Sequence, residues 1–170
     1  NKSGLDRTLR SKAADTDNSS SFPELIYADN LSEAMDVLFS EGVTTVFNND
    51  GDNSAGMGIG TDSEYVETSD GKAIAVDSLA ARYVRFYANG NSVNGYSHYV
   101  EIEVYGTSTS VALGKPISSS NSFSNSGSIT DGNKLDMAAF ADSTPNQGLQ
   151  WVQVDLQAVY DVNEIRLWHY

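Results

Sequence analysis

Apolar and polar side chains alternate in several short stretches of this chain, which is the pattern of β-strands with one buried face. The clearest stretch is 100–105, where Val and Ile at alternate positions share one face and two glutamates occupy the other. Residues 82–87, 151–156 and 163–168 alternate in the same way, and the β-branched and aromatic run 43–47 predicts a further strand. Clusters of Gly, Asn and Asp separate these stretches as turns. The pattern predicts an all-β fold, an antiparallel β-sandwich.

Residues 31–40 allow two interpretations. Apolar side chains recur there at helical spacing, Asn30 and Glu33 have the positions of a capping box, and Gly42 would end a helix. The local pattern therefore favours a helix over 31–40, whereas the family resemblance described below favours a strand at 36–39.

Composition narrows the classes of protein and partner. With 23 acidic against 10 basic residues and a formal charge of -13, the chain lacks the cationic surface that binds nucleic acid. No cysteine is present, which excludes disulfides, thiolate metal sites and a cysteine nucleophile. No apolar run approaches the roughly 20 residues that cross a bilayer, so we expect no membrane insertion. Polar residues dominated by Ser, Asn, Thr, Asp and Gly favour an extracellular or cell-surface location.

Recognisable catalytic motifs are missing from the sequence. Only His98 and His169 are available as imidazole bases, and no serine lies in a G-x-S-x-G elbow. The glycines at 56, 58 and 60 do not have the spacing of a dinucleotide-binding fingerprint. The carboxylates show no spacing that singles out a glycosidase pair. We therefore expect a protein that is not an enzyme.

Several motifs form two blocks along the chain. The first block has 81–87 followed by 99–106, and the second has motifs at 112–116, 129–133, 150–156 and 165–168. Together they resemble the discoidin family, which includes the coagulation factor V/VIII type C domains and the related family 32 carbohydrate-binding modules. The resemblance implies a jelly-roll β-sandwich of the galactose-binding-domain-like kind.

The two blocks stand in the reverse of the family's order. Residues 23–106 resemble the C-terminal half of the module, 112–170 resemble its N-terminal half, and 107–111 connect them. Residues 1–22 have no hydrophobic periodicity, so we expect a flexible leader there. The chain closes on itself as a circular permutant, or halves of neighbouring chains complete one another head-to-tail, or the sequence spans parts of two tandem modules. The closed permutant is the preferred interpretation.

A calcium site is the chemistry that the resemblance implies. The segment 130–133 is similar to the family's calcium loop, in which an Asp side chain and neighbouring carbonyls bind the ion with help from a Glu. Carried over, the ligands are Asp131, Asn133 and Glu101, with Asp136 where the family often has Ser or Thr. Carboxylate and amide oxygens are ligands that Ca²⁺ prefers, although Asp-Gly is also a common turn.

Sugar recognition needs an aromatic ring to stack on a pyranose and a few fixed polar groups. In the family these residues lie in loops at one end of the sandwich. The candidates here are Asn94, Tyr96, His98, His169 and Tyr170. The alternative for each is a half-buried packing role, and strand alternation assigns Trp151 and Trp168 to the core.

Two functions follow from these expectations. The first is a non-catalytic extracellular carbohydrate-binding or adhesion module, stabilised by Ca²⁺, whose partner is a glycan or polysaccharide. The alternative is a structural subunit of an extracellular filament or surface layer, in which identical subunits complete one another's sandwich halves.

Overall fold

The computed structural model describes residues 42–54, 56, 58–63, 65–66, 68–89, 95–135, 141–143 and 148–169, with 141–143 described by their backbone alone. The chain divides into two units, Asn1–Thr44 and Thr45–Tyr170, and the named elements all belong to the second. The expected leader at 1–22 and the helix or strand within 31–40 lie outside the described residues. The strand predicted at 43–47 is wrong: these residues have no regular secondary structure, and Val43 is 49% exposed.

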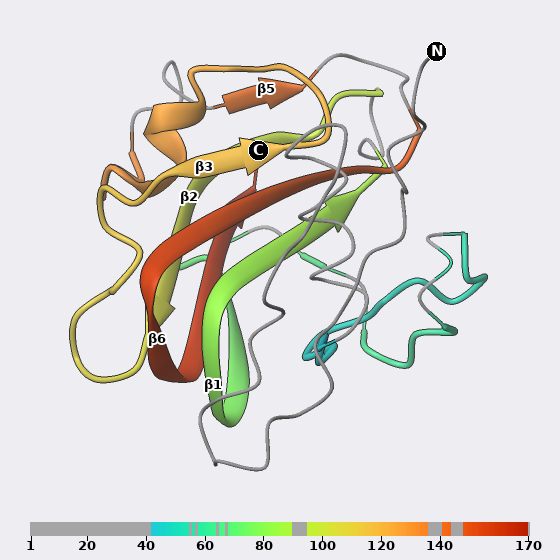
Figure 1. The fold of residues 1–170 in the computed structure, drawn as a ribbon. Helices are drawn as coiled ribbons and strands as arrows, with labels where there is room; N and C mark the ends of the chain where they lie inside the picture. Colours follow the sequence, from blue (N-terminus) through green and yellow to red (C-terminus); the bar gives the residue numbers. More distant parts are fainter. Residues whose placement is uncertain are drawn as a thin grey trace, which may run out of the picture. The chain divides into compact units, whose positions relative to one another are not determined.

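The second unit is built mainly from antiparallel strands (Figure 1). In chain order the elements are β1 (Lys72–Ala88), β2 (His98–Tyr105), β3 (Ile117–Ser119), β4 (Phe123–Ser124), the short 3-10 helix η1 (Ser126–Thr130), β5 (Ala141–Ser143) and β6 (Gln150–His169). The all-β class predicted from the alternating pattern is confirmed. In the described part of the chain, no helix has the length and apolar character needed to cross a membrane.

β6 pairs with three other strands of the sheet. The strand order is β1-β6-β2-β5-β4, β3 pairs with β6 off this path, and these pairings are antiparallel. The first part of β6 lies between β1 and β3, and its last part lies between β1 and β2. The strand at 150–169 is therefore hydrogen-bonded to two strands from the other half of the sequence.

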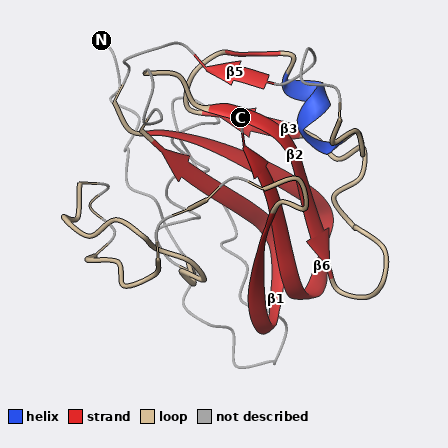
Figure 2. Ribbon diagram, turned by 180° about the vertical axis from the view of Figure 1, so that it is seen from behind, coloured by secondary structure: helices blue, strands red, loops and turns tan. Residues whose placement is uncertain are grey.

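β1 and β6 bend, so that the sheet folds over onto itself. Ser78 and Gln157 have positive φ angles of 43° and 65°, and the register between the two strands breaks between Ala75 and Leu79 and again near Tyr83. Figures 1 and 2 show both strands turning at the lower end of the view and running back upward. Each long strand thereby contributes to two facing layers.

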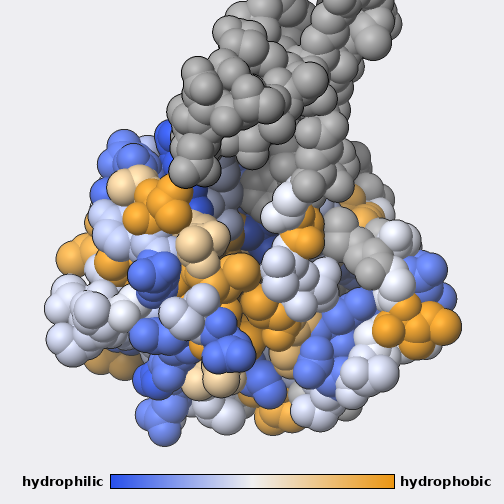
Figure 3. All heavy atoms as spheres, turned by 60° about the horizontal axis from the view of Figure 1, so that its bottom comes forward, coloured by the Kyte–Doolittle hydropathy of each residue, from blue (hydrophilic) through white to orange (hydrophobic). Residues whose placement is uncertain are grey.

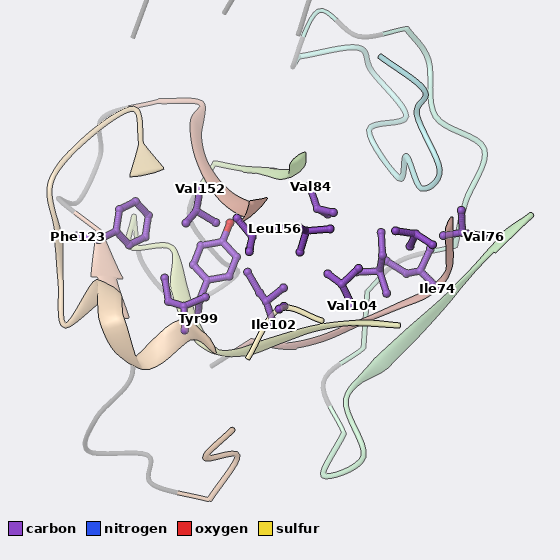
Figure 4. Close-up of a cluster of buried hydrophobic side chains, with 14 residues drawn as sticks. Ile74, Val76, Val84, Tyr99, Ile102, Val104, Phe123, Val152 and Leu156 are labelled. Carbon is purple, nitrogen blue, oxygen red and sulfur yellow. The ribbon is translucent and has the colours of Figure 1, made fainter. Parts of the chain in front are cut away.

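The hydrophobic core lies between these layers. Figure 4 shows Val84 and Val152 on one side of the cluster and Ile102 and Val104 on the other, with Tyr99 toward one end. Ile102, Val104 and Val152 are all 0% exposed. Figure 3 shows hydrophilic and hydrophobic residues intermingled on the described part of the face that it presents. Strand alternation has therefore gathered the branched aliphatic side chains inside.

A one-residue bulge near the start of β2 changes which of its side chains point into the core. Tyr99 is opposite His169 and Glu101 is opposite Trp168, so β2 has one extra residue, Val100, between successive pairs. Tyr99 consequently joins the main core cluster in the place predicted for Val100, which is buried outside that cluster. Glu101 keeps the face that its alternation with Ile102 and Val104 predicts, away from the core.

The connector between the two halves is a tight turn. Tyr105 and Ser110 form an antiparallel bridge, and the backbone N–H of Val111 donates to the carbonyl of Val104 at 2.8 Å. Asn163 Nδ2 donates to the carbonyl of Gly106 at 2.9 Å, which ties the turn to β6. Any side chain at 106 would lie 2.6 Å from a backbone oxygen of β6, so this close approach requires glycine.

Candidate functional site: a carboxylate beneath the 131–135 loop

Three of the predicted calcium ligands, Glu101, Asp131 and Asn133, come together beside β2. Glu101 is 1% exposed, and its Oε2 accepts a hydrogen bond of 3.1 Å from the backbone N–H of Gly132. Alternation with Ile102 and Val104 directs this glutamate away from the core, and η1 leads directly into the loop above it. The fourth predicted ligand, Asp136, lies outside the described residues.

Side-chain hydrogen bonds to the backbone shape the loop 131–135. Asp131 Oδ1 accepts from the N–H of Asn133 at 2.8 Å, and Asn133 Oδ1 accepts from the N–H of Leu135 at 3.1 Å. Gly132 has a φ of 84°, in the left-handed region that favours glycine. A side chain at 132 would also lie 3.2 Å from Leu113 Cδ1. The local sequence Asp-Gly-Asn is thus suited to hold a backbone amide over Glu101.

The two carboxylates each keep one oxygen outside these hydrogen bonds. Within the described residues, Glu101 Oε1 and Asp131 Oδ2 take part in no hydrogen bond or ion pair. Burial raises the pKa of Glu101 to about 8; the Gly132 hydrogen bond opposes this shift, and the charges of Asp131 and Glu103 add to it. A carboxyl group in this environment is stabilised in its ionised form by an additional positive charge.

The oxygen donors of this site fit Ca²⁺. The ion takes six to eight oxygen ligands from carboxylates, amides and backbone carbonyls, and Glu101, Asp131 and Asn133 offer the first two kinds. Among the described residues, no group of three or more His, Cys, Asp or Glu side chains gathers as a metal cluster. A cation here would therefore depend on amide and backbone oxygens of the loop as well as on carboxylates.

Lys134 and Glu103 form an ion pair next to this site that the sequence did not single out. Lys134 Nζ lies 2.7 Å from Glu103 Oε1 and 4.9 Å from the centre of the Trp168 ring. The other carboxylate oxygen of Glu103 accepts a hydrogen bond from the hydroxyl of Tyr105. The alternation of 100–105 predicted which face of the strand Glu103 occupies. Nothing in the sequence around Lys134 indicated that this lysine pairs with Glu103.

The predicted sugar-binding residues His98 and His169 lie where β2 begins and β6 ends. The His169 ring makes edge contacts with Tyr99 and Tyr65, at centroid distances of 5.3 and 6.0 Å, and the Tyr96 ring lies 5.5 Å from His98. Burial lowers the pKa of His169 to about 4, and the neighbouring His98 adds to this shift. Only 8% of His98 is exposed, so its main contacts are internal.

The two histidines and Tyr96 therefore lie near one another, while Asn94 and Tyr170 lie outside the described residues. Tyr65 belongs to this region as well, although the sequence did not indicate it. Its hydroxyl donates to the carbonyl of Leu167 and accepts from the N–H of His169, both at 3.2 Å. It is separated from these partners by about one hundred residues, so no local pattern identifies it.

Trp151 and Trp168 are buried, as strand alternation predicted, with 8% and 5% exposure. Neither belongs to the main hydrophobic cluster. The Arg85 guanidinium lies 3.8 Å from the Trp151 ring centre, just as the Lys134 ammonium lies over Trp168. Both rings are thus covered by cations on the outer sides of the strands.

Neither a protein-family model nor a curated protein nor a solved structure matches this chain.

Proposed function

We propose that this protein is a calcium-stabilised, non-catalytic carbohydrate-binding module of the discoidin kind, which acts outside the cell. The observation that carries the proposal is the buried carboxylate of Glu101 facing the Asp131–Asn133 loop. Ca²⁺ bound there would tie the loop to β2 and supply the positive charge that a buried, ionised Glu101 needs. The jelly-roll arrangement and the reversed order of the halves are part of the same proposal.

The ligand of the proposed module is a glycan or polysaccharide. Tyr96 is half-buried beside His98, so part of its ring is available to stack on a sugar. His169 is the third predicted contact, and its neighbours Tyr65 and Tyr99 hold it in place. An acidic chain with a formal charge of -13 favours neutral sugars over sulfated ones because like charges repel.

Closure within one chain is the arrangement that we propose for the two halves. The pairing of β6 with both β1 and β2, and the tight turn that follows β2, support it. The alternative, a filament or surface-layer subunit, requires the same pairings to form between chains. Light scattering over a wide concentration range separates the two, since only the second grows with concentration.

Thermal unfolding with and without calcium tests the metal part of the proposal. At a calcium concentration one hundred times the Kd we expect about 2.7 kcal/mol of added stability, or a rise in Tm of roughly 5–10 °C. Glu101→Gln removes the buried charge and should abolish most of this rise. Glu164→Gln is the control, because it removes a glutamate that pairs with Arg166 and is not at the loop. An unchanged Tm of the wild-type protein on adding EDTA contradicts the proposal.

A glycan array in calcium tests the sugar part independently. Binding of a neutral glycan that Tyr96→Ala abolishes supports the proposal. Tyr160→Ala serves as the control, since this tyrosine is also half-buried but belongs to the bend of β6. The absence of any glycan signal from protein that has bound calcium would count against the lectin function and leave the cation site standing.

A further inference from the structure

The loop 131–135 is held firmly at its entry. Ile129 and Thr130, at the end of η1, are 0% and 1% exposed. The carbonyl of Thr130 accepts from the N–H of Gly114 at 2.7 Å, and its hydroxyl donates to the carbonyl of Lys115 at 3.0 Å. Asp131 therefore starts from a fixed point.

Near the exit of the loop, among its described residues 131–135, the Lys134 side chain reaches both strands beneath. Its ammonium group contacts Glu103 on β2 at 2.7 Å and lies 4.9 Å from the centre of the Trp168 ring on β6. The neighbouring Leu135 is 89% exposed and contributes little packing. Lys134 thus connects the loop to both strands beneath it, at the position directly after Asn133.

The charge of Lys134 has two opposite consequences for a cation beside Glu101. An ammonium group near the site repels a second cation, whereas a fixed loop presents its oxygens in one arrangement and lowers the entropy cost of binding. The repulsion is largely offset, because Glu103 carries the opposite charge 2.7 Å from the ammonium nitrogen. The effect of Lys134 on the position of the loop is therefore the one that we test.

From this geometry we propose that Lys134 is a positioning residue for the cation site, and that it holds the loop over Glu101 through its ion pair with Glu103 and its contact with Trp168. This inference rests on the proposed calcium site. Half-buried ion pairs and cation–π contacts of this kind change binding by roughly threefold to tenfold. The site then has three parts: ligands in the loop, a ligand on β2, and a salt bridge that sets the distance between them.

Calorimetric titration with Ca²⁺ tests the role of Lys134. Lys134→Met should weaken the calcium Kd by roughly threefold to tenfold. Lys134→Arg should restore most of the affinity, since arginine can pair with Glu103 and stack on Trp168. Glu103→Gln breaks the same pair from the other strand and should weaken binding as well. Lys115→Met is the matched control, because its ammonium contacts Gln157 rather than the site, and it should bind as the wild type does.

The direction in which the calcium Kd changes decides whether Lys134 acts by positioning the loop or by repelling the cation. A Lys134→Met variant that binds calcium as tightly as the wild type, or more tightly, overturns the inference, because charge relief then outweighs position. A merely structural role would lower the Tm in EDTA and leave the calcium Kd unchanged, which also overturns it. If Lys134→Met does not fold, Glu103→Gln and Lys134→Arg still supply the comparison. Failure of the wild-type protein to bind calcium rejects the proposed site itself, and the inference with it.

Discussion

Two neighbouring regions at one end of β2 and β6 bury ionisable groups in opposite surroundings. On the outer side, Glu101 lies among a backbone amide, Asp131 and the Glu103 ion pair, and burial raises its pKa to about 8. On the core side, His169 lies among aromatic rings, and burial lowers its pKa to about 4. Both groups are driven toward their neutral forms. A bound cation stabilises an ionised carboxylate but disfavours a protonated imidazole, so only the glutamate can be held in its charged form by a metal ion.

The bulge in β2 is what separates these two regions. Without the extra residue Val100, Tyr99 and Glu101 would share one face of the strand, because side chains alternate with a period of two. With it, Tyr99 packs into the core against Phe123 at a ring distance of 5.8 Å, while Glu101 stays on the opposite face beside the loop. Variants on the two sides of the bulge should therefore respond differently to calcium.

The largest expected effect is on the core side, at Tyr99. Tyr99→Ala removes a 2% exposed ring and should lower the free energy of unfolding by about 3–5 kcal/mol, measured by urea denaturation. The loss should be the same with calcium and with EDTA. Tyr99→Phe is the control and should change stability by less than about 1.5 kcal/mol, because it keeps the ring. A calcium-dependent loss would mean that the two regions are coupled across the bulge.

Sequence alternation predicted parts of the three long strands, β1, β2 and β6, and the burial of their apolar residues, because both follow from local spacing. Residues 82–87, 100–105, 151–156 and 163–168 all fall within β1, β2 or β6. The same spacing could not predict the bulge in β2, since an inserted residue is specified by the partner strand. It also failed at 43–47, where β-branched residues find no strand partner among the described residues.

The candidate site was predictable to the extent that its parts resemble a known loop. Glu101, Asp131 and Asn133 were chosen from such a resemblance, and the structure places them together. Lys134 was not chosen, because its role depends on Glu103, which is thirty-one positions earlier in the sequence and reaches it only through the fold. Long-range ion pairs of this kind leave no periodic trace in a sequence.

The pH dependence of stability distinguishes the two regions, because Glu101 and His169 should give slopes of opposite sign in the free energy of unfolding against pH. The pKa of Glu101 is raised from 4.5 to about 8, so in EDTA its contribution to stability is full below pH 4.5 and is lost as pH rises toward 8. The pKa of His169 is lowered from 6.5 to about 4, so its contribution is present above pH 6.5 and is lost as pH falls toward 4. Each slope has an upper limit of about 1.4 kcal/mol per pH unit.

Between pH 6.5 and 8, of these two groups only Glu101 changes the free energy of unfolding with pH. We expect the free energy of unfolding in EDTA to fall by about 1–2 kcal/mol over this interval. Glu101→Gln should remove the fall, because glutamine does not ionise, while His169→Phe should change only the profile below pH 6.5. Urea denaturation at intervals of half a pH unit measures both. A wild-type profile that is flat from pH 6.5 to 8 would show that Glu101 is already ionised without a cation.

The most local effect concerns Gly132, in the loop itself. Gly132→Ala places a side chain at a φ of 84° and should cost about 1–2 kcal/mol of stability in EDTA. Gly56→Ala is the matched control, because its φ of 71° carries a similar cost and its side chain would meet no atom within 4 Å. Both variants should be destabilised without calcium, and Gly132→Ala somewhat more, because its side chain would lie 3.2 Å from Leu113 Cδ1. Only Gly132→Ala should also lose part of the calcium-induced rise in Tm, because residue 132 lies between the two loop ligands and donates its N–H to Glu101. If calcium raises the Tm of both variants equally, the loop does not take part in binding the cation. Glu101 is then a buried acid without a metal.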